Sequence, residues 1–438
     1  MMSIDATIVA TALDAIQQGL DTSINLAGWT LTAYSFGSVV MLPVSGKLAE
    51  RFGRRQVFLA SVAVFTLASL GCAMADNIYV LILLRALQAV GGAGFTPTAT
   101  GIIVDHFGAE RDRYVSLFGS IFPIGAMIGP IFGGYFVGYW SWRDVFYVNV
   151  PIGLLIIVLA WRFVPHDPER TDARANKRMD IAGVALLGSG LFAGMLGVSM
   201  LGEEHLSAGW WLTLAPLLFA VAMFAAFFRH IRRAETPFIA PRLIYGRDFG
   251  AVNLVNMTYS GIVTGVLALV PLYAISRYDI GALQSGTLLT GQGFATLICS
   301  LCAVALLRRS GYRLPLYLGS TITVIGMVLL ALPPVGGSSP YAWLAFATIF
   351  VGAGNGIINP STRNAGLQLA PESSSMVAAL RTLSLQVGSI ATISIVTAIL
   401  ARRGDTGLTL AWIFAFLAVF RLLVMPLIRR VPEQRGAW

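Results

Sequence analysis

The sequence predicts an all-α membrane protein with fourteen membrane-spanning helices, and three observations support this fold class. Hydrophobic residues make up 56% of the 438 residues, charged residues make up 12%, and the mean hydropathy is +0.75. Soluble domains carry about 25% charged residues, roughly twice this fraction. Fourteen apolar runs, from residues 1–19 to residues 408–428, approach the ~20 residues that a spanning helix needs. Basic residues recur in every second connection between these runs.

The distribution of Lys and Arg predicts the orientation of the helices. If the connection that carries Lys47 and Arg51 is cytoplasmic, 23 of the 30 Lys and Arg residues fall in cytoplasmic connections or in the C-terminal tail, and 4 fall on the opposite side. Cytoplasmic loops of membrane proteins carry such an excess of positive charge. We therefore expect a multi-pass protein of a cytoplasmic (inner) membrane with both termini in the cytoplasm. The net charge of +9 reflects this topology and predicts no nucleic-acid partner.

The composition excludes several other classes of protein. The four His residues are scattered, and Cys299 and Cys302 form a C-x-x-C inside an apolar run with no second pair, so we expect no metal and no cofactor. Every connection between the runs is short, which leaves no room for a catalytic or ATP-binding domain. We therefore expect a protein that is not an enzyme and that uses an ion gradient or the gradient of its own substrate.

Two polar, charged connectors divide the chain. They cover residues 166–179 and 230–247. The predicted organisation is an N-terminal six-helix bundle over 1–165, connectors and two extra central helices over 166–247, and a C-terminal six-helix bundle with a short cytoplasmic tail over 248–438. A weak repeat relates the two bundles, because residues 90–94 (VGGAG) resemble 351–354 (VGAG), and the basic loop 51–55 resembles 308–313. Repeats of this kind build many secondary transporters.

The first apolar run lacks a basic flank, since residues 1–46 contain no Lys or Arg. Asp5 stands only four residues from the start. We therefore expect that the first spanning helix is truncated in this sequence and that a cytoplasmic head precedes it in the full protein.

The loop after the second run carries a glycine-rich, charged pattern, G-K-L-A-E-R-F-G-R-R over residues 46–55. It resembles the loop 2–3 signature of the major facilitator superfamily, with a Glu where that family usually has Asp. The resemblance implies a gating loop whose charged side chains bond to neighbouring helix ends on the cytoplasmic side. A basic loop that serves only topology is the alternative. The residues concerned are Gly46, Lys47, Glu50, Arg51, Gly53, Arg54 and Arg55.

Arg85 and Asp5 are two of the charged residues that lie within apolar runs. Arg85 stands in the fourth run, where a guanidinium needs a partner or a wet cavity. The stretch around it resembles the superfamily motif l-x-x-x-R-x-x-q-G, with Ala89 in place of the glycine, and the resemblance links Arg85 to proton transfer. Asp5 matches the acid of the L-D-x-T-I-V motif found in the first span of fourteen-span drug:proton antiporters. The alternatives are that Arg85 anchors helix packing and that Asp5 is a solvated residue at a helix end.

The fifth run contains the string G-x-x-x-G-P-x-x-G-G over residues 125–134. Glycines four residues apart share one helix face and let a neighbouring backbone come close. A proline in the same stretch bends or weakens the helix. The string resembles the antiporter motif of superfamily exporters, and a glycine-rich packing helix is the alternative. Its members are Gly125, Gly129, Pro130, Gly133 and Gly134.

Taken together, these motifs and the W-R-D-V-F…N-x-P-x-G pattern over 142–153 resemble the fourteen-span drug:proton antiporters of the EmrB/QacA type. The resemblance implies a proton-coupled efflux transporter that exports small amphiphilic compounds or drugs by alternating access. A dedicated exporter of one endogenous metabolite, peptide or siderophore is the alternative on the same fold. In a two-membrane bacterium the resemblance also implies a periplasmic adaptor and an outer-membrane channel as partners.

The resemblance places substrate in a cavity lined by the first, second, fourth and fifth spans of each bundle. No acid occurs at mid-depth of the last six runs, whereas Arg381 and Arg421 do, so we expect neutral or weakly anionic substrates to be preferred over dications. For each lining residue, helix packing is an equal alternative. The candidate substrate-binding residues are Tyr34, Gln88, Phe95, Asn253, Asn256, Tyr259, Gln292, Asn355 and Arg381.

Overall fold

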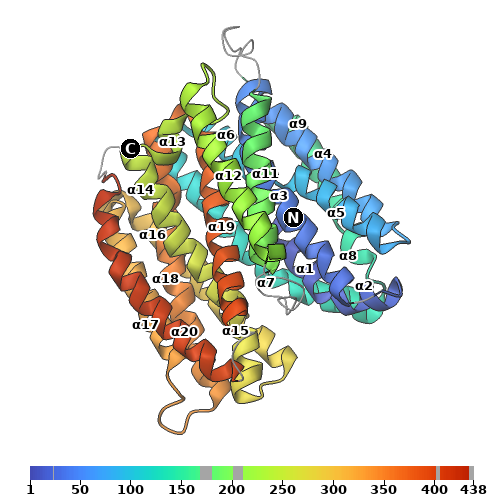
Figure 1. The fold of residues 1–438 in the computed structure, drawn as a ribbon, viewed down its shortest axis with the longest axis vertical. Coiled ribbons are helices and arrows are strands. Elements are labelled where there is room, and N and C mark those ends of the chain that lie inside the picture. Colours follow the sequence, from blue (N-terminus) through green and yellow to red (C-terminus); the bar gives the residue numbers. More distant parts are fainter. Residues whose placement is uncertain (23, 168–179, 201–210, 401–404, 434–438) are drawn as a thin grey trace. The chain divides into compact units, whose positions relative to one another are not determined.

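The computed structural model describes residues 1–22, 24–167, 180–200, 211–400 and 405–433. These residues form helices and short connections, without a β-strand among them (Figure 1). Ten of the described helical stretches are long and apolar enough to cross a membrane. The all-α membrane fold predicted from the sequence is therefore confirmed, whereas the count of fourteen spans stays a prediction. Most of the connector predicted over 166–179 lies outside the described residues.

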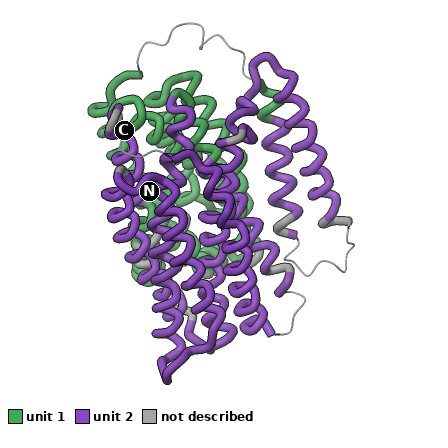
Figure 2. Tube along the Cα trace, turned by 90° about the vertical axis from the view of Figure 1, so that its left-hand side faces the viewer, with its two compact units in different colours: residues 1–106, 122–184, 372–380 green, residues 107–121, 185–371, 381–438 purple. Residues whose placement is uncertain are grey.

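The chain divides into two compact units (Figure 2). Unit 1 comprises residues 1–106, 122–184 and 372–380, and unit 2 comprises residues 107–121, 185–371 and 381–438. Neither unit is continuous in sequence, because helices α7 (Arg111–Tyr139) and α19 (Ser374–Leu400) each contribute to both. The three sequence-continuous domains stay a prediction.

Unit 1 is built around long helices that surround a core of buried apolar side chains, among them Ile8, Leu81 and Phe146. In this unit α4 packs against both α5 and α9, and α3 packs against α5 (Figure 1). The last part of α7 and the first turns of α19 complete it. Its other helices are α1 (Met2–Thr11), α2 (Leu13–Gly19), α3 (Ile24–Phe52), α4 (Arg54–Ala73), α5 (Ile78–Gly92), α6 (Phe95–Phe107), α8 (Asp144–Tyr147) and α9 (Asn149–Phe163).

Unit 2 has α18 at its centre, packed between α16 and α17, with α20 on the other side of α17. A π-helical turn, η3 (Asn256–Gly261), interrupts the stretch that begins as α14 and continues as α15. Single π-helical turns inside α-helices are rare and occur frequently at functional sites. The helices of this unit are α11 (Ile181–Met200), α12 (Trp211–Arg233), α13 (Pro241–Tyr245), α14 (Arg247–Val255), α15 (Ile262–Tyr278), α16 (Ala282–Ser310), α17 (Arg313–Ala331), α18 (Pro340–Leu369), α20 (Thr406–Val424) and the 3₁₀ turn η5 (Met425–Arg430).

The helix boundaries follow from local chemistry. Asn77 accepts a hydrogen bond from Tyr79 N (2.8 Å) at the start of α5, and Asp405 accepts one from Leu408 N (2.8 Å) at the start of α20. Such side-chain caps satisfy backbone donors that a helix end leaves free. Gly53 separates α3 from α4 with a φ of 100°, a left-handed conformation that glycine adopts without steric cost.

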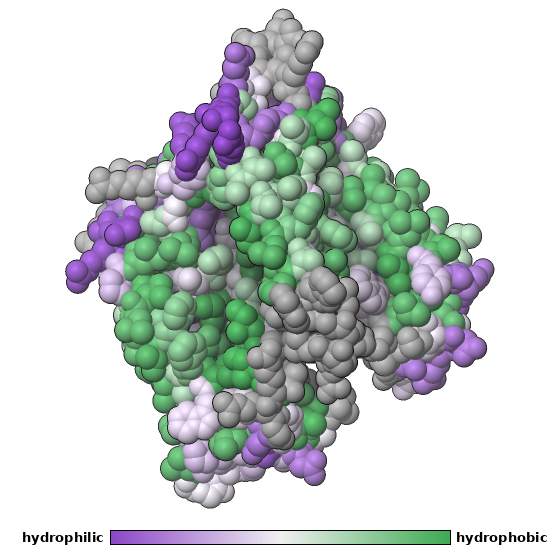
Figure 3. All heavy atoms as spheres, viewed as in Figure 1, coloured by the Kyte–Doolittle hydropathy of each residue, from purple (hydrophilic) through white to green (hydrophobic). Residues whose placement is uncertain are grey.

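The exposed surfaces of the helices are largely apolar. Figure 3 shows hydrophobic side chains over the helix faces, with hydrophilic side chains gathered toward helix ends. Leu83, Trp412 and Leu423 are each about 70% exposed. Large apolar side chains exposed in this number do not suit an aqueous surface, and they fit contact with lipid.

Candidate functional site

Asp5 on α1 and Arg85 on α5 form a buried ion pair in unit 1. Arg85 Nη1 lies 2.7 Å from Asp5 Oδ2, and both side chains are 0% exposed. The interpretation of Asp5 as a solvated residue at a helix end is therefore wrong, because neighbouring helices enclose its carboxylate. Withdrawing two charges from water is costly, and removing one partner of such a pair leaves the other charge uncompensated.

Amide side chains complete the hydrogen bonding of the carboxylate. Asp5 Oδ1 accepts from Asn149 Nδ2 at 2.8 Å and from Gln88 Nε2 at 3.0 Å. Gln88 Nε2 also donates to Ser69 Oγ at 2.7 Å. Residues from α1, α5 and α9 thus meet at one carboxylate, and Ser69 of α4 binds one of them, Gln88. Gln88 was predicted as a substrate contact, and in this structure its side chain belongs to the ion-pair cluster.

The guanidinium of Arg85 is held by weaker contacts on its other side. Its Nε donates to Thr30 O at 3.3 Å, and its central carbon lies 4.4 Å from the centre of the Tyr34 ring. A cation over an aromatic face is stabilised by the ring quadrupole. Arg85 Nη2 has no hydrogen-bond partner within the described residues. The cluster therefore fixes the charge of Arg85 mainly through Asp5.

The glycines of the fifth apolar run bring α1 close to α7 within unit 1. A methyl group on Gly129 would lie 3.0 Å from Ile4 O and would collide with the Thr7 hydroxyl, and one on Gly133 would lie 3.0 Å from Ile8 O. Gly125 likewise faces Ser3. Bare faces of this kind allow close approach of two backbones. The glycine spacing of four thus matches Ser3, Thr7 and Thr11 on α1, the helix that carries Asp5.

The other members of the fifth run differ from these three glycines. A methyl group on Gly134 would meet nothing within 4 Å. The side chain of Pro130 lies outside what the structure describes, so its predicted effect on the helix stays a prediction.

The predicted gating loop, residues 46–55, lies mostly in the end of α3 and the start of α4, and its Arg54 and Arg55 contact other helices of unit 1. Arg54 forms an ion pair with Asp105 on α6, and Arg55 Nη2 donates to Trp161 O on α9 at 2.7 Å. Arg51 lies over the ring of Phe52. Gly46 packs against α19, where a methyl group would lie 3.1 Å from Ser375 O. The side chains of this loop therefore bind several helix ends, and its gating role stays a prediction.

Asp167 is a residue of this region that the sequence did not reveal. Its carboxylate accepts from Arg54 N (2.8 Å) and Arg55 N (3.2 Å), which caps α4 from the segment after α9. Unit 2 repeats the arrangement, because Glu433, after η5, accepts from Tyr312 N (3.1 Å) next to the start of α17. In both loops a glycine of positive φ precedes the capped residues, Gly53 and Gly311. A capping acid more than 100 residues away leaves no local sequence signal.

Unit 2 contains two buried arginines whose surroundings differ from those of Arg85. Arg421 Nη1 donates to Tyr259 O at 2.8 Å, and its central carbon lies 4.5 Å from the centre of the Tyr259 ring. Arg381 Nη2 donates to Asn359 Oδ1 at 2.9 Å. Among the described residues, no carboxylate lies within ion-pair distance of either guanidinium. The sequence had signalled this imbalance, since it places no acid at mid-depth of the last six runs.

The remaining candidates for substrate contact lie in separate surroundings. Asn256 Nδ2 donates to Arg381 O at 2.6 Å, and Asn253 Nδ2 donates to Leu243 O at 2.9 Å. Their predicted role in binding substrate is not tested by these contacts. Of the others, Phe95 packs against Phe65, Gln292 donates to Thr296, and Asn355 accepts from Asn359.

Asp112, at the start of α7, is a second buried acid. The sequence did not predict its burial, because it stands between two basic residues. It lies in unit 2, where Asp112 Oδ2 accepts from Gln368 Nε2 at 2.8 Å and from the Tyr312 hydroxyl at 3.1 Å. Burial, together with the neighbouring carboxylate of Asp112, raises the pKa of the Tyr312 phenol. The phenol therefore stays protonated and acts as a hydrogen-bond donor.

The long apolar helices and the buried ion pair define a multi-pass membrane protein. The chain belongs to the Major Facilitator Superfamily, whose family model matches residues 1–393. This is a family of transporters rather than of enzymes.

Several curated proteins are similar in sequence. The multidrug resistance protein B homolog of Mycobacterium tuberculosis is 31% identical over 339 residues, which cover 76% of this chain and 59% of that protein. The multidrug transporter protein MdtP of Bacillus subtilis is 29% identical over 82% of this chain and 65% of that protein. The methylenomycin A resistance protein of Streptomyces coelicolor is 27% identical over 97% of this chain and 90% of that protein. The chain thus spans about three fifths of the length of the first relatives that it matches.

Solved structures support the same fold. The human organic anion transporter MFSD10 matches with a TM-score of 0.69 at 14% identity, over 98% of this chain and 96% of that one. The proton:xylose symporter XylE matches with a TM-score of 0.67 at 14% identity, over 99% of this chain and 94% of that one. At this level of identity the likeness concerns the fold alone.

Proposed function

We propose that this protein is a proton-coupled efflux transporter, an antiporter that exports small amphiphilic compounds or drugs by alternating access. The buried pair of Asp5 and Arg85 carries the proposal, because a carboxylate held by a guanidinium inside a membrane helix bundle is a group whose charge a proton can cancel. The names of the relatives from Mycobacterium tuberculosis and Bacillus subtilis support export of drugs.

The coupling step follows from the energetics of the pair. A proton on Asp5 removes the negative charge that compensates Arg85, and breaking a buried pair costs about 3–5 kcal/mol. A conformation in which Arg85 reaches water is then favoured. Loss of the proton restores the pair and the starting conformation. Proton binding thereby biases the equilibrium between two conformations, as coupled transport requires.

The two buried arginines of unit 2 support a preference for substrate charge. Arg381 and Arg421 place positive charge inside the helix bundle without a carboxylate among the described residues. We therefore propose that neutral or weakly anionic amphiphiles are preferred over dications. Strong proton-coupled export of a divalent cation would contradict this preference.

A dedicated exporter of one endogenous compound is the second candidate. It is favoured by the relative that matches along most of its own length, which is named for resistance to a single antibiotic, methylenomycin A. A survey of substrates separates the two candidates, since a multidrug exporter moves several unrelated amphiphiles and a dedicated exporter moves one.

The proposed setting is the cytoplasmic membrane with both termini inside the cell. The excess of Lys and Arg in alternate connections supports this orientation. A periplasmic adaptor and an outer-membrane channel stay predicted partners for a two-membrane host. Labelling of single cysteines introduced near residues 53 and 143 with an impermeant reagent tests the orientation, since only the second position is expected to react in intact cells.

Proton movement in inverted membrane vesicles tests the proposed function. Adding lipophilic compounds to energised vesicles should dissipate the proton gradient with the unmodified protein and not with Asp5→Asn. Asp21→Asn is the matched control, because Asp21 is exposed and the same atoms change. Gradient dissipation that persists in Asp5→Asn would show that Asp5 does not carry the proton.

A double variant separates loss of coupling from loss of folding. Asp5→Asn combined with Arg85→Gln leaves no uncompensated charge at this site, so it should fold better than either single variant. We expect this variant to exchange labelled substrate across the membrane without a proton gradient and to be unable to accumulate it with one. Uphill accumulation by the double variant would contradict the proposed coupling.

A further inference from the structure

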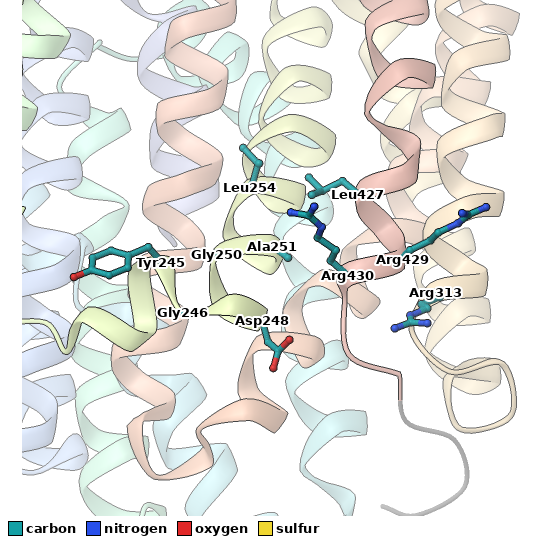
Figure 4. A pocket seen from close by; sticks show the side chains of 10 residues that line it. All are labelled: Tyr245, Gly246, Asp248, Gly250, Ala251, Leu254, Arg313, Leu427, Arg429 and Arg430. Atoms are coloured by element: carbon teal, nitrogen blue, oxygen red, sulfur yellow. The ribbon is translucent and has the colours of Figure 1, made fainter.

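A cavity of about 800 Å³ lies at one end of the helices of unit 2. It is lined by the first turns of α14, by the start of α17 and by η5, which follows α20 (Figure 4). The distribution of Lys and Arg predicts that these helix ends lie on the cytoplasmic side, where basic connections gather. None of the residues assigned to the ion pair or to substrate lines this cavity.

Three arginines give the cavity a positive lining. Arg429 and Arg430 are exposed, and neither makes a hydrogen bond or ion pair with any described residue. Arg313 Nε donates to Val431 O at 2.8 Å and lies 3.6 Å from Glu433 Oε2. Asp248 is the acidic residue of the lining. With Glu433 paired to Arg313, three guanidinium groups stand against two carboxylates. The cavity therefore keeps an excess of positive charge, which favours an anionic occupant.

The arrangement of the side chains adds to this preference. In Figure 4 the guanidinium of Arg430 turns toward α14, beside Leu254 and Leu427, whereas Arg429 extends the other way. Guanidinium groups bind phosphate oxygens through two parallel hydrogen bonds. The arginines that surround the cavity from α17 and η5 can therefore contact phosphate oxygens from more than one side.

Apolar side chains next to the arginines distinguish a lipid from a free anion. Leu254 and Leu427 line the cavity, and Leu254 is 43% exposed. The adjoining turns of the same helices carry exposed leucines, Leu423 on α20 and Leu314 and Leu318 on α17. A free phosphate would leave these side chains uncovered, whereas the acyl chains of a phospholipid would cover them.

We propose that this cavity binds the phosphodiester headgroup of an anionic phospholipid from the cytoplasmic leaflet. Basic pockets between membrane helices on this side suit such headgroups. The bound headgroup links α14, α17 and η5, so it stabilises the ends of these helices against separation.

Thermal unfolding of the purified full chain tests the proposal. Unfolding is followed in detergent with cardiolipin, phosphatidylglycerol or phosphatidylethanolamine of matched acyl chains, and with inorganic phosphate. We expect the two anionic lipids to raise the unfolding temperature, and phosphatidylethanolamine and inorganic phosphate to have little effect. An equal shift with inorganic phosphate would assign the site to a free anion and overturn the lipid proposal, and an equal shift with phosphatidylethanolamine would overturn the preference for anionic lipid.

Charge-removing variants locate the binding. Arg429→Gln with Arg430→Gln should weaken cardiolipin binding about thirtyfold, measured by native mass spectrometry, because each basic side chain near a membrane surface contributes attraction to anionic lipid. The control is Arg229→Gln with Arg233→Gln, which removes the same charge from exposed positions of α12. Equal weakening in both variants would indicate a general charge effect and overturn the site.

A conservative variant guards against a purely structural effect. Arg429→Lys with Arg430→Lys keeps both charges and loses the paired hydrogen bonds, so it should bind with intermediate affinity. Binding as weak as in the Gln variant, with an unchanged unfolding temperature in the absence of lipid, would mean that charge contributes nothing to the site.

Discussion

Arg85 in unit 1 and Arg421 in unit 2 are both buried beside the face of a tyrosine, at 4.4 Å and 4.5 Å from the ring centres. They differ in what compensates the charge. Arg85 faces the carboxylate of Asp5, whereas Arg421 donates to a backbone carbonyl, Tyr259 O. A carboxylate can be neutralised by one proton, and a carbonyl cannot. Proton binding can therefore change the net charge around Arg85, whereas the net charge around Arg421 stays the same.

The largest expected difference between the two environments concerns stability. Arg85→Met leaves the Asp5 carboxylate buried without its partner and should lower the free energy of unfolding by about 3–5 kcal/mol. Arg421→Met removes a cation–π contact and a hydrogen bond and also removes a desolvated charge, so its effect should stay below about 2 kcal/mol. Thermal and denaturant unfolding of both variants measures the difference. A larger loss in Arg421→Met would mean that its surroundings compensate its charge better than the described contacts suggest.

The packing of α1 on α7 gives the next effect. Gly129→Val places side-chain atoms against Ile4 O and Thr7, and overpacking of this kind costs about 1–3 kcal/mol. Because the same contact positions the helix of Asp5, proton coupling should fall together with stability. Gly134→Val is the control, since nothing lies within 4 Å of its added Cβ, and it should leave both unchanged. If Gly134→Val lost as much coupling as Gly129→Val, the close approach of α1 would not matter.

Unit 2 offers a glycine contact of its own for comparison. Gly388 on α19 faces the backbone of η3, where an added methyl group would approach Met257 O and Gly261. Gly388→Ala should cost about 1–3 kcal/mol in unfolding free energy, as overpacking does elsewhere. It should leave the number of protons exchanged per substrate molecule unchanged. The described contacts of α19 include no ion pair that a proton could break. Uncoupling in Gly388→Ala would show that unit 2 takes part in proton transfer.

The smallest expected effect concerns the acid that caps a helix start in each unit. Asp167→Ala and Glu433→Ala each remove an acid that accepts from the first backbone donors of α4 or from Tyr312 N beside α17. Loss of a helix cap costs about 0.5–2 kcal/mol. Similar losses in the two variants would support an equivalent role of the two acids. A loss confined to Asp167→Ala would show that only the loop before α4 depends on its cap.

The sequence by itself determined the class of fold and part of the site. Apolar runs of membrane length, a basic residue pattern in alternate connections, and glycines four residues apart are all local in the chain, so their consequences can be predicted without coordinates. Asp5 and Arg85 were recognisable for the same reason, because a charge inside an apolar run needs a partner. The lack of acids in the last six runs also indicated in advance that Arg381 and Arg421 differ from Arg85.

Only the tertiary structure decided which groups meet. It brought Asn149 and Gln88 to the carboxylate of Asp5, aligned Thr7 with Gly129, and placed Asp167 and Glu433 at helix starts more than 100 residues away. Helical periodicity states which side chains share a face. It does not state which other helix packs on that face, because that choice depends on the fit of all side chains at once. For this reason the cavity of Arg313, Arg429 and Arg430, formed by three helix ends distant in sequence, emerged only from the folded chain.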